Sequence, residues 1–370
     1  MDMPTKSRGG AAARSPHKGW SEPARICWAR SSADLKLVNL ALQGGGAHGA
    51  FAWGVLDRLL EDDRIAFDGI SATSAGAMNA TVLAYGLAAG GRAEAKRALA
   101  IFWRRVADVA SAGPLQPTLF DRLTGNESLE NSPAFIWFDL LTRLLSPYQF
   151  NPFNYNPLRQ VLVDTVDFEA LRMARCPVKL YLSATNVRTG KIKVFGNDEI
   201  GPDAVLASGC LPFMFQAVEV EGEHYWDGGY MGNPAIFPLI YNCATRDVVI
   251  VHINPMERAA LPRTASEILN RVNEISFNSS LMREMRAIAF VTRLIEDGKV
   301  DRTDMKHMLI HGIMADDVMG QLSVASKLNG DWDHLMRLHE VGRERAAAWL
   351  AVNFDKLGNE ASIDVRALYL

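Results

Sequence analysis

Hydrophobic positions in the N-terminal half of the chain switch between continuous apolar runs and helical spacing. Residues 35–43 (LKLVNLALQ) are a short apolar run bounded by glycines, which predicts a buried strand. In residues 49–62 the apolar side chains recur instead at helical spacing. A second strand at 65–73 and a second helix at 75–87 repeat this order. The alternation predicts an α/β fold, with three α/β/α layers around a mostly parallel central sheet.

The same criteria predict further elements downstream. The predicted strands are residues 178–187, 191–195, 217–220, 224–226, 246–254 and 307–313. The predicted helices are residues 92–110, 135–145, 203–208 and a helical C-terminal extension beyond residue 262. Residues 113–157 are rich in proline, asparagine and aromatic side chains. We expect this insertion to be either a lid over a site or a variable surface excursion.

Two segments raise the question of targeting or membrane insertion. Residues 1–34 carry six basic groups against three acidic ones and contain no apolar signal-peptide core. We interpret them as a disordered basic leader, with an Arg- and Ser-rich transit peptide as the alternative. Residues 69–91 lack charge and are long enough to cross a bilayer. Their many polar residues and glycines favour a buried strand, turn and helix instead.

Composition and charge reduce the number of possible function classes. The 370 residues are 48% hydrophobic and 22% charged, as is usual for a globular protein. The formal net charge of −3 argues against a dedicated nucleic-acid-binding protein. The four cysteines are far apart and form no CxxC pair, so we expect free thiols, no metal cluster and a cytoplasmic location.

A glycine-rich loop is the first candidate for chemistry. Gly44, Gly45, Gly46 and Gly49 follow the first predicted strand and open a helix, which satisfies the G-x-G-x-x-G pattern. Such a loop offers backbone amides to an anion, either a pyrophosphate or the oxyanion of a tetrahedral intermediate. A dinucleotide site also requires an acidic residue at the end of the next strand. The acidic residues 61–63 precede that strand.

The second predicted strand ends instead in a turn with a serine at its apex. Ser74, between Ala72 and Gly76, resembles the nucleophile elbow G-x-S-x-G, in which small neighbours expose a hydroxyl. Ala72 replaces the first glycine. Because both turns follow parallel strands, they lie at the same edge of the sheet, where ligands bind. We therefore expect the loop and the serine to form one site.

A nucleophilic serine needs a base within hydrogen-bonding reach. None of the eight histidines follows a turn of catalytic character. Asp227 does, because it comes directly after a predicted strand and is followed by Gly228 and Gly229, which allow a tight turn. Asp227 is therefore the candidate base.

These three motifs, in this order, resemble the patatin-like phospholipase family, which is related in fold to the cytosolic phospholipases. The resemblance covers residues 38–240 and includes SATN at 183–186 and ASGCLP at 207–212. It implies a Ser-Asp dyad of Ser74 and Asp227 without histidine. It also implies that Gly44, Gly45 and Gly46 supply the oxyanion amides, that the substrate is a phospholipid or lysophospholipid ester, and that no cofactor or metal is needed.

Departures from the family pattern leave other functions open. Besides Ala72, His48 stands where the family often has Arg or Lys, and residues 241–370 carry no motif beyond their last core strands. The alternatives are an NAD(P)-dependent oxidoreductase that uses the glycine loop, and a lipid-binding protein without catalysis. A triacylglycerol or polyester substrate also remains open. As partners we expect a lipid ester and the surface of a membrane, lipid droplet or granule, but no nucleic acid.

Overall fold

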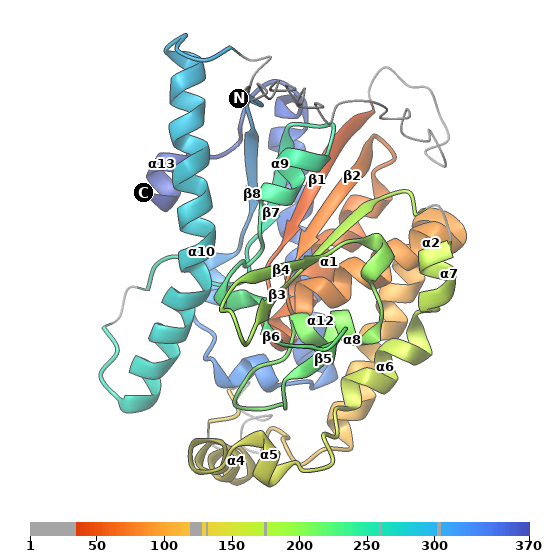
Figure 1. Ribbon diagram of the computed structural model, residues 1–370, viewed down its shortest axis with the longest axis vertical. Helices are drawn as coiled ribbons and strands as arrows, with labels where there is room; N and C mark the ends of the chain where they lie inside the picture. The colour runs from red at the N-terminus through yellow and green to blue at the C-terminus, as the bar shows by residue number, and fades with distance from the viewer. Residues whose placement is uncertain (1–34, 119–127, 131, 174–175, 259–260, 302–304) are drawn as a thin grey trace, which may run out of the picture.

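A computed structural model describes residues 35–370 except 119–127, 131, 174–175, 259–260 and 302–304 (Figure 1). The predicted leader and Cys27 lie outside these residues. Cys176, Cys210 and Cys243 are free thiols, as predicted. No helix among the described residues is long and apolar enough to cross a bilayer.

One mixed sheet forms the centre of the molecule, in the strand order β5-β6-β3-β2-β1-β7-β8, with β4 paired to β3. Its strands are β1 (Lys36–Leu42), β2 (Ile65–Ala72), β3 (Lys179–Asn186), β4 (Ile192–Phe195), β5 (Val218–Val220), β6 (Glu223–Asp227), β7 (Asp247–Val251) and β8 (Leu309–Ile313). The pairs from β3 through β2, β1 and β7 to β8 are parallel, whereas β4, β5 and β6 join antiparallel. The predicted, mostly parallel sheet is confirmed.

Helices cover both faces of this sheet. They are α1 (Gly49–Glu61), α2 (Ala75–Ser111), α4 (Pro133–Leu144), α5 (Pro147–Phe150), α6 (Pro157–Thr165), α7 (Phe168–Met173), α8 (Pro202–Ser208), α9 (Phe237–Asn242), α10 (Ala265–Glu296), α11 (Asp316–Met319), α12 (Trp332–Asn353) and α13 (Val365–Tyr369). The larger core cluster packs α1, α2, α8 and α12 on one face, and a smaller one packs α9, α10 and α13 on the other. This is the predicted three-layer arrangement.

The strands that carry this core are buried on both faces. All five residues of β7 (DVVIV) are buried, as are the last five of β1, which is the usual pattern of a parallel strand covered by helices. The helices predicted at 75–87 and 92–110 appear as α2, which is interrupted by non-helical backbone at Gly90 and Gly91.

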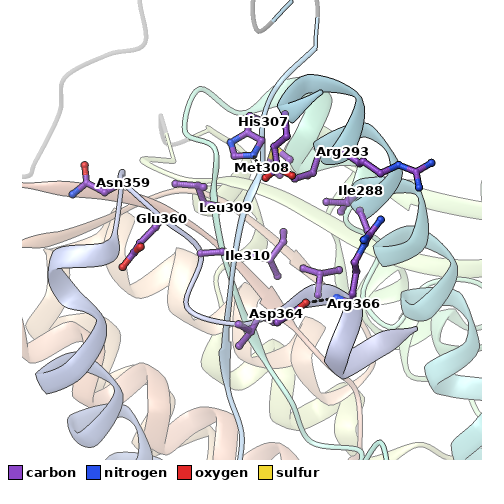
Figure 2. A pocket seen from close by; sticks show the side chains of 16 residues that line it. Ile288, Arg293, His307, Met308, Leu309, Ile310, Asn359, Glu360, Asp364 and Arg366 are labelled. Atoms are coloured by element: carbon purple, nitrogen blue, oxygen red, sulfur yellow. Dashed lines mark hydrogen bonds and ion pairs between the residues drawn. The ribbon is translucent and has the colours of Figure 1, made fainter. Parts of the chain in front are cut away.

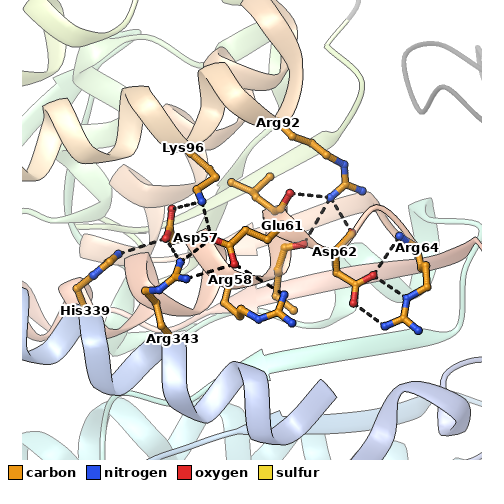
Figure 3. Close-up of polar contacts among 11 residues, drawn as sticks. Asp57, Arg58, Glu61, Asp62, Arg64, Arg92, Lys96, His339 and Arg343 are labelled. Carbon is orange, nitrogen blue, oxygen red and sulfur yellow. Dashed lines mark hydrogen bonds and ion pairs between the residues drawn. The ribbon is translucent and has the colours of Figure 1, made fainter. Parts of the chain in front are cut away.

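A network of charged side chains fastens α12 to α1 and α2 (Figure 3). Arg343 of α12 bonds to Asp57 and Glu61 of α1, and Lys96 of α2 reaches the same two carboxylates. Burial alone would raise the pKa of Asp57, but hydrogen bonding to His339 and the charges of Lys96 and Arg343 lower it overall. Helix α12 is thereby tied to the helix that follows the glycine loop.

Strand β3 brings the ends of β2 and β6 together. Leu182 pairs with Ala72 of β2 on one side and with β4 on the other. Two residues further, Ala184 pairs with β4 and with Asp227 of β6. Because β4 occupies one edge of β3 from Leu182 to Thr185, β6 must continue the opposite edge beyond the end of β2. The residues that follow Ala72 therefore lie near Asp227.

Candidate active site

Ser74 occupies the turn between β2 and α2 in a conformation unusual for a serine. Its backbone has φ 56° and ψ −123°, and positive φ values are strained for residues other than glycine. The Ser74 N–H donates a hydrogen bond to Oγ of Ser208 at 2.9 Å, so the end of α8 supports the turn. Ala72 ends β2, and Gly76 lies in the first turn of α2. A strand, a sharp turn and a helix thus present the hydroxyl, as the motif predicted.

The glycine loop lies directly against this turn. A Cβ atom on Gly44 would be only 2.6 Å from Cβ of Ser74, so a side chain at Gly44 would push the loop off the serine. Gly46 has φ +59°, and a Cβ there would meet the carbonyl of Lys327. Gly49 begins α1, and its carbonyl accepts a hydrogen bond from Asn79 of α2 at 2.9 Å. The loop conformation therefore requires glycine at the positions closest to Ser74.

The loop amides differ in availability. The Gly44 N–H donates to Oδ1 of Asn233 at 2.7 Å, and the Gly44 carbonyl accepts from Nδ2 of Asn254 at 2.8 Å. Within the described part of the chain, no hydrogen bond uses the N–H groups of Gly45 and Gly46. Of the three amides that the resemblance suggested, Gly44 holds the loop in place, and Gly45 and Gly46 can bind an anion.

Asp227 ends β6 and is 2% exposed. Its Oδ1 accepts a hydrogen bond from the Gly229 N–H at 2.7 Å, and the nearby hydroxyl of Ser74 favours its charged form. Burial raises the pKa of Asp227 to about 6, against the opposing effects of Gly229, Ser74 and the charge of Lys327. Gly228 and Gly229 form the tight turn after the strand. The structure thus places the predicted serine and aspartate close together.

A small cavity of about 60 Å³ joins these groups. Its lining consists of Gly44, Gly45, Gly46, Ser74, Leu211, Asp227, Gly229, Asn233, Phe277, Lys327 and Leu328. We call it the Ser74 cavity. Among the described residues that line it there is no histidine: His48 contacts Oγ of Ser326 at 2.7 Å, and His252 contacts the hydroxyl of Tyr369 at the same distance. Each of these two histidines is thus engaged by another side chain.

Lys327 is a residue of the cavity that the sequence did not reveal. It lies in the short 3-10 helix at Ala325–Leu328, far outside the recognised motifs. Its Nζ donates a hydrogen bond to Oδ1 of Asn254 at 2.8 Å, and burial lowers its pKa to about 8. No pattern of spacing marks this lysine. Lys327 supplies a positive charge to the Ser74 cavity. His48 does not supply one, because burial lowers its pKa.

A larger groove of about 450 Å³ adjoins the Ser74 cavity. The two share four lining residues, namely Leu211, Phe277, Lys327 and Leu328. Phe135 and Phe138 of α4 form another wall, and Phe213 and Met214 line it too. We call it the α4 groove. Its mostly apolar walls suit a hydrocarbon chain.

Two other hollows lie away from Ser74 and Asp227. One of about 390 Å³ lies between α10, β8 and the C-terminal residues 359–366 (Figure 2). The other, of about 870 Å³, lies between α9 and α10. Neither shares a lining residue with the Ser74 cavity. The volume of a cavity therefore does not identify the candidate active site. The cavity where the glycine loop, Ser74 and Asp227 meet does.

Comparison with known proteins identifies the family of the chain. Residues 40–240 match the family model described as patatin-like phospholipase, whereas no curated protein matches the chain. Similar solved structures include VipD from Legionella pneumophila, with 15% identity, a TM-score of 0.40, and coverage of 86% of this chain and 67% of that one. The heterodimeric ExoU–SpcU complex from Pseudomonas aeruginosa matches with 16% identity, a TM-score of 0.33, and coverage of 87% and 52%. Because the family match spans more than half of its length, the chain belongs to the patatin-like phospholipase family and is a lipid acyl hydrolase.

Proposed function

We propose that the protein cleaves the acyl ester of a phospholipid or lysophospholipid through an acyl-enzyme on Ser74, with Asp227 as the base. The observation that carries this proposal is that Ser74 and the buried carboxylate of Asp227 line one small cavity, beside a glycine loop with two free amides. A nucleophile, a base and an oxyanion site are thus adjacent, as acyl transfer requires.

The environment of Asp227 suits it to act without histidine. An ordinary carboxylate is a weak base at neutral pH, with a pKa near 4. A pKa of about 6 leaves Asp227 ionised at neutral pH and makes it a better proton acceptor. Because Asp227 lines the same cavity as the serine hydroxyl, no intermediate group is needed between them.

The reaction then proceeds in two steps. Oγ of Ser74 attacks the ester carbonyl while its proton passes to Asp227, and the amides of Gly45 and Gly46 bind the oxyanion. The ester C–O bond breaks, and the departing alcohol takes the proton from Asp227. Water next attacks the acyl-enzyme and gives its proton to Asp227, which returns it to Ser74 as the fatty acid leaves.

The size of the spaces favours a lipid over a dinucleotide. The Ser74 cavity of about 60 Å³ next to the glycine loop is too small for an NAD(P) molecule. The α4 groove beside it is large enough for an acyl chain and is mostly apolar. This argues against the oxidoreductase alternative. We further propose a cytoplasmic location, based on the free thiols of Cys176, Cys210 and Cys243.

Steady-state hydrolysis of a fluorescent phosphatidylcholine tests the proposed dyad. Ser74→Ala and Asp227→Asn should each reduce turnover to background, whereas His48→Ala and His252→Ala should keep measurable turnover. Circular dichroism melting of each variant separates lost chemistry from lost folding. If a histidine variant falls to background while Asp227→Asn keeps most of its turnover, the dyad is wrong and a histidine is the base.

A further inference from the structure

Helix α4 carries apolar side chains around most of its circumference. Phe135 and Phe138 on its inner side line the α4 groove. On its outer side Ile136 and Leu140 are exposed, and Trp137 is 66% exposed. No residue of α4 is buried. The polar residues of α4, Asp139, Thr142 and Arg143, also line the groove, so its outer side is apolar and exposed.

The exposed apolar surface continues beyond this helix. The segment after α4 adds Tyr148 and Phe153, of which Phe153 is 94% exposed, and Phe213 adds to it at the α4 groove. The members of this surface, the α4 patch, are Ile136, Trp137, Leu140, Leu144, Tyr148, Phe153 and Phe213. Clusters of exposed apolar residues mark interaction sites.

Two contacts hold this segment beside the opposite wall of the groove. The side chain of Gln216 donates to the carbonyl of Asn151 at 2.8 Å, and the backbone N–H of Ala217 donates to the hydroxyl of Tyr148 at 3.3 Å. The α4 patch is therefore attached to the same loop that carries Phe213. Figure 1 shows α4 and α5 side by side, at the opposite end of the sheet from α9.

The charges on α4 compensate each other. Asp139 and Arg143 form an ion pair at 2.8 Å, and they are its only charged residues. The helix has no net charge to attract a charged partner. Burial of apolar surface is thus the interaction that its outer face offers.

We propose that the α4 patch docks on the surface of a phospholipid bilayer, so that an acyl chain enters the α4 groove directly from the bilayer. This deepens the proposed function and rests on it. The α4 groove shares lining residues with the Ser74 cavity. The patch therefore lies at the entrance through which a substrate acyl chain would reach Ser74. A protein seated on the patch would cover that entrance. Tryptophan and tyrosine side chains, moreover, favour the membrane interface.

Binding to vesicles of pure phosphatidylcholine, measured by co-sedimentation, tests the docking step. The full chain carries Ser74→Ala, so that the lipid is not consumed. We expect Trp137→Ser and Phe153→Ser each to lower the partition coefficient about tenfold, since each removes a large apolar side chain from the contact. The binding should persist in 0.5 M NaCl, because the patch carries no net charge.

Two control variants show whether the effect belongs to the patch. Tyr241→Ser removes an aromatic side chain that is 75% exposed on α9, and should leave partition unchanged. Trp137→Phe keeps an apolar ring and should bind nearly as well as the parent, but should lose part of the tryptophan quenching by brominated lipid. Equal partition of Trp137→Ser and its parent overturns the proposal. So does a parent dimer that Trp137→Ser dissociates, since a second copy would then cover the patch.

Activity with Ser74 intact separates docking from catalysis. Trp137→Ser should hydrolyse a short, soluble p-nitrophenyl ester within twofold of the wild type, but vesicle lipid about tenfold more slowly through a raised apparent KM. Equal loss on both substrates overturns the docking role. If the wild type hydrolyses neither ester, the proposed function fails, while the sedimentation result still decides whether the patch binds lipid.

Discussion

Lys327 donates a hydrogen bond from its ammonium group to Oδ1 of Asn254 at 2.8 Å, and this contact ties the C-terminal part of the chain to the glycine loop. Nδ2 of Asn254 in turn donates to the carbonyl of Gly44. Next to Lys327, Ser326 contacts His48 in the same loop. Residues beyond the family match thus hold the loop that we propose binds the oxyanion.

Loss of the Lys327 charge should shift the pH dependence of hydrolysis. The ammonium group lowers the pKa of Asp227, so Lys327→Met should raise that pKa above about 6. Because Asp227 must be ionised to accept a proton, the acid limb of the kcat/KM profile should move to higher pH by roughly one unit. The profile is measured with a soluble, uncharged ester.

Lys327→Arg is the matched control for this prediction. It keeps the positive charge and should keep the acid limb near pH 6. Identical profiles for the methionine variant and the wild type would show that the lysine charge has no part in catalysis.

Asp227→Asn should stabilise the protein while it abolishes hydrolysis. The folded-state pKa of about 6 lies above the ordinary value of 3.8, so folding favours the protonated carboxyl. The associated stability is present below about pH 4 and is lost as pH rises through 6. At pH 8 the wild type should be less stable than the uncharged variant by about 1–3 kcal/mol.

Urea unfolding at pH 8 and at pH 4 measures this difference. The stability gap between Asp227→Asn and the wild type should shrink toward zero at the lower pH. An equal stability gap at the two pH values would contradict this account. The asparagine would then act through packing, and the buried charge of Asp227 would not destabilise the wild type.

Ser74→Gly should also increase stability at the expense of function. A serine at φ 56° stores backbone strain that a glycine does not, so the free energy of unfolding should rise by about 1 kcal/mol. Ser74→Ala keeps the strain and serves as the control for the lost hydroxyl. If the glycine variant is no more stable than the alanine variant, the turn stores no strain at Ser74.

Much of this fold follows from local sequence patterns. The apolar runs at 35–43 and 246–254 correspond to β1 and β7, because strands covered on both faces need continuous hydrophobic sequence. The short helices α6, α7 and α9 were not predicted. α6 and α9 begin at or next to a proline, and all three are too short to show a clear helical period.

The candidate site could be predicted only in part. Gly44, Ser74 and Asp227 lie in recognisable turns, but their contact depends on β6 continuing the edge of β3 beyond β2, which is a long-range pairing. Lys327 and Asn233 reach the site from segments without a motif, and the use of the Gly44 amide by Asn233 could not be foreseen. Local sequence thus indicates the chemistry, and tertiary packing decides which groups are free to perform it.

Covalent labelling with a fluorophosphonate, followed by peptide mass spectrometry, tests the central claim most directly. We expect a single modified peptide with the adduct on Ser74, no adduct in Ser74→Ala, and labelling at least a hundredfold slower in Asp227→Asn, since the hydroxyl then lacks its base. An adduct on another residue of the wild type, or undiminished labelling of Asp227→Asn, would contradict the Ser74–Asp227 dyad.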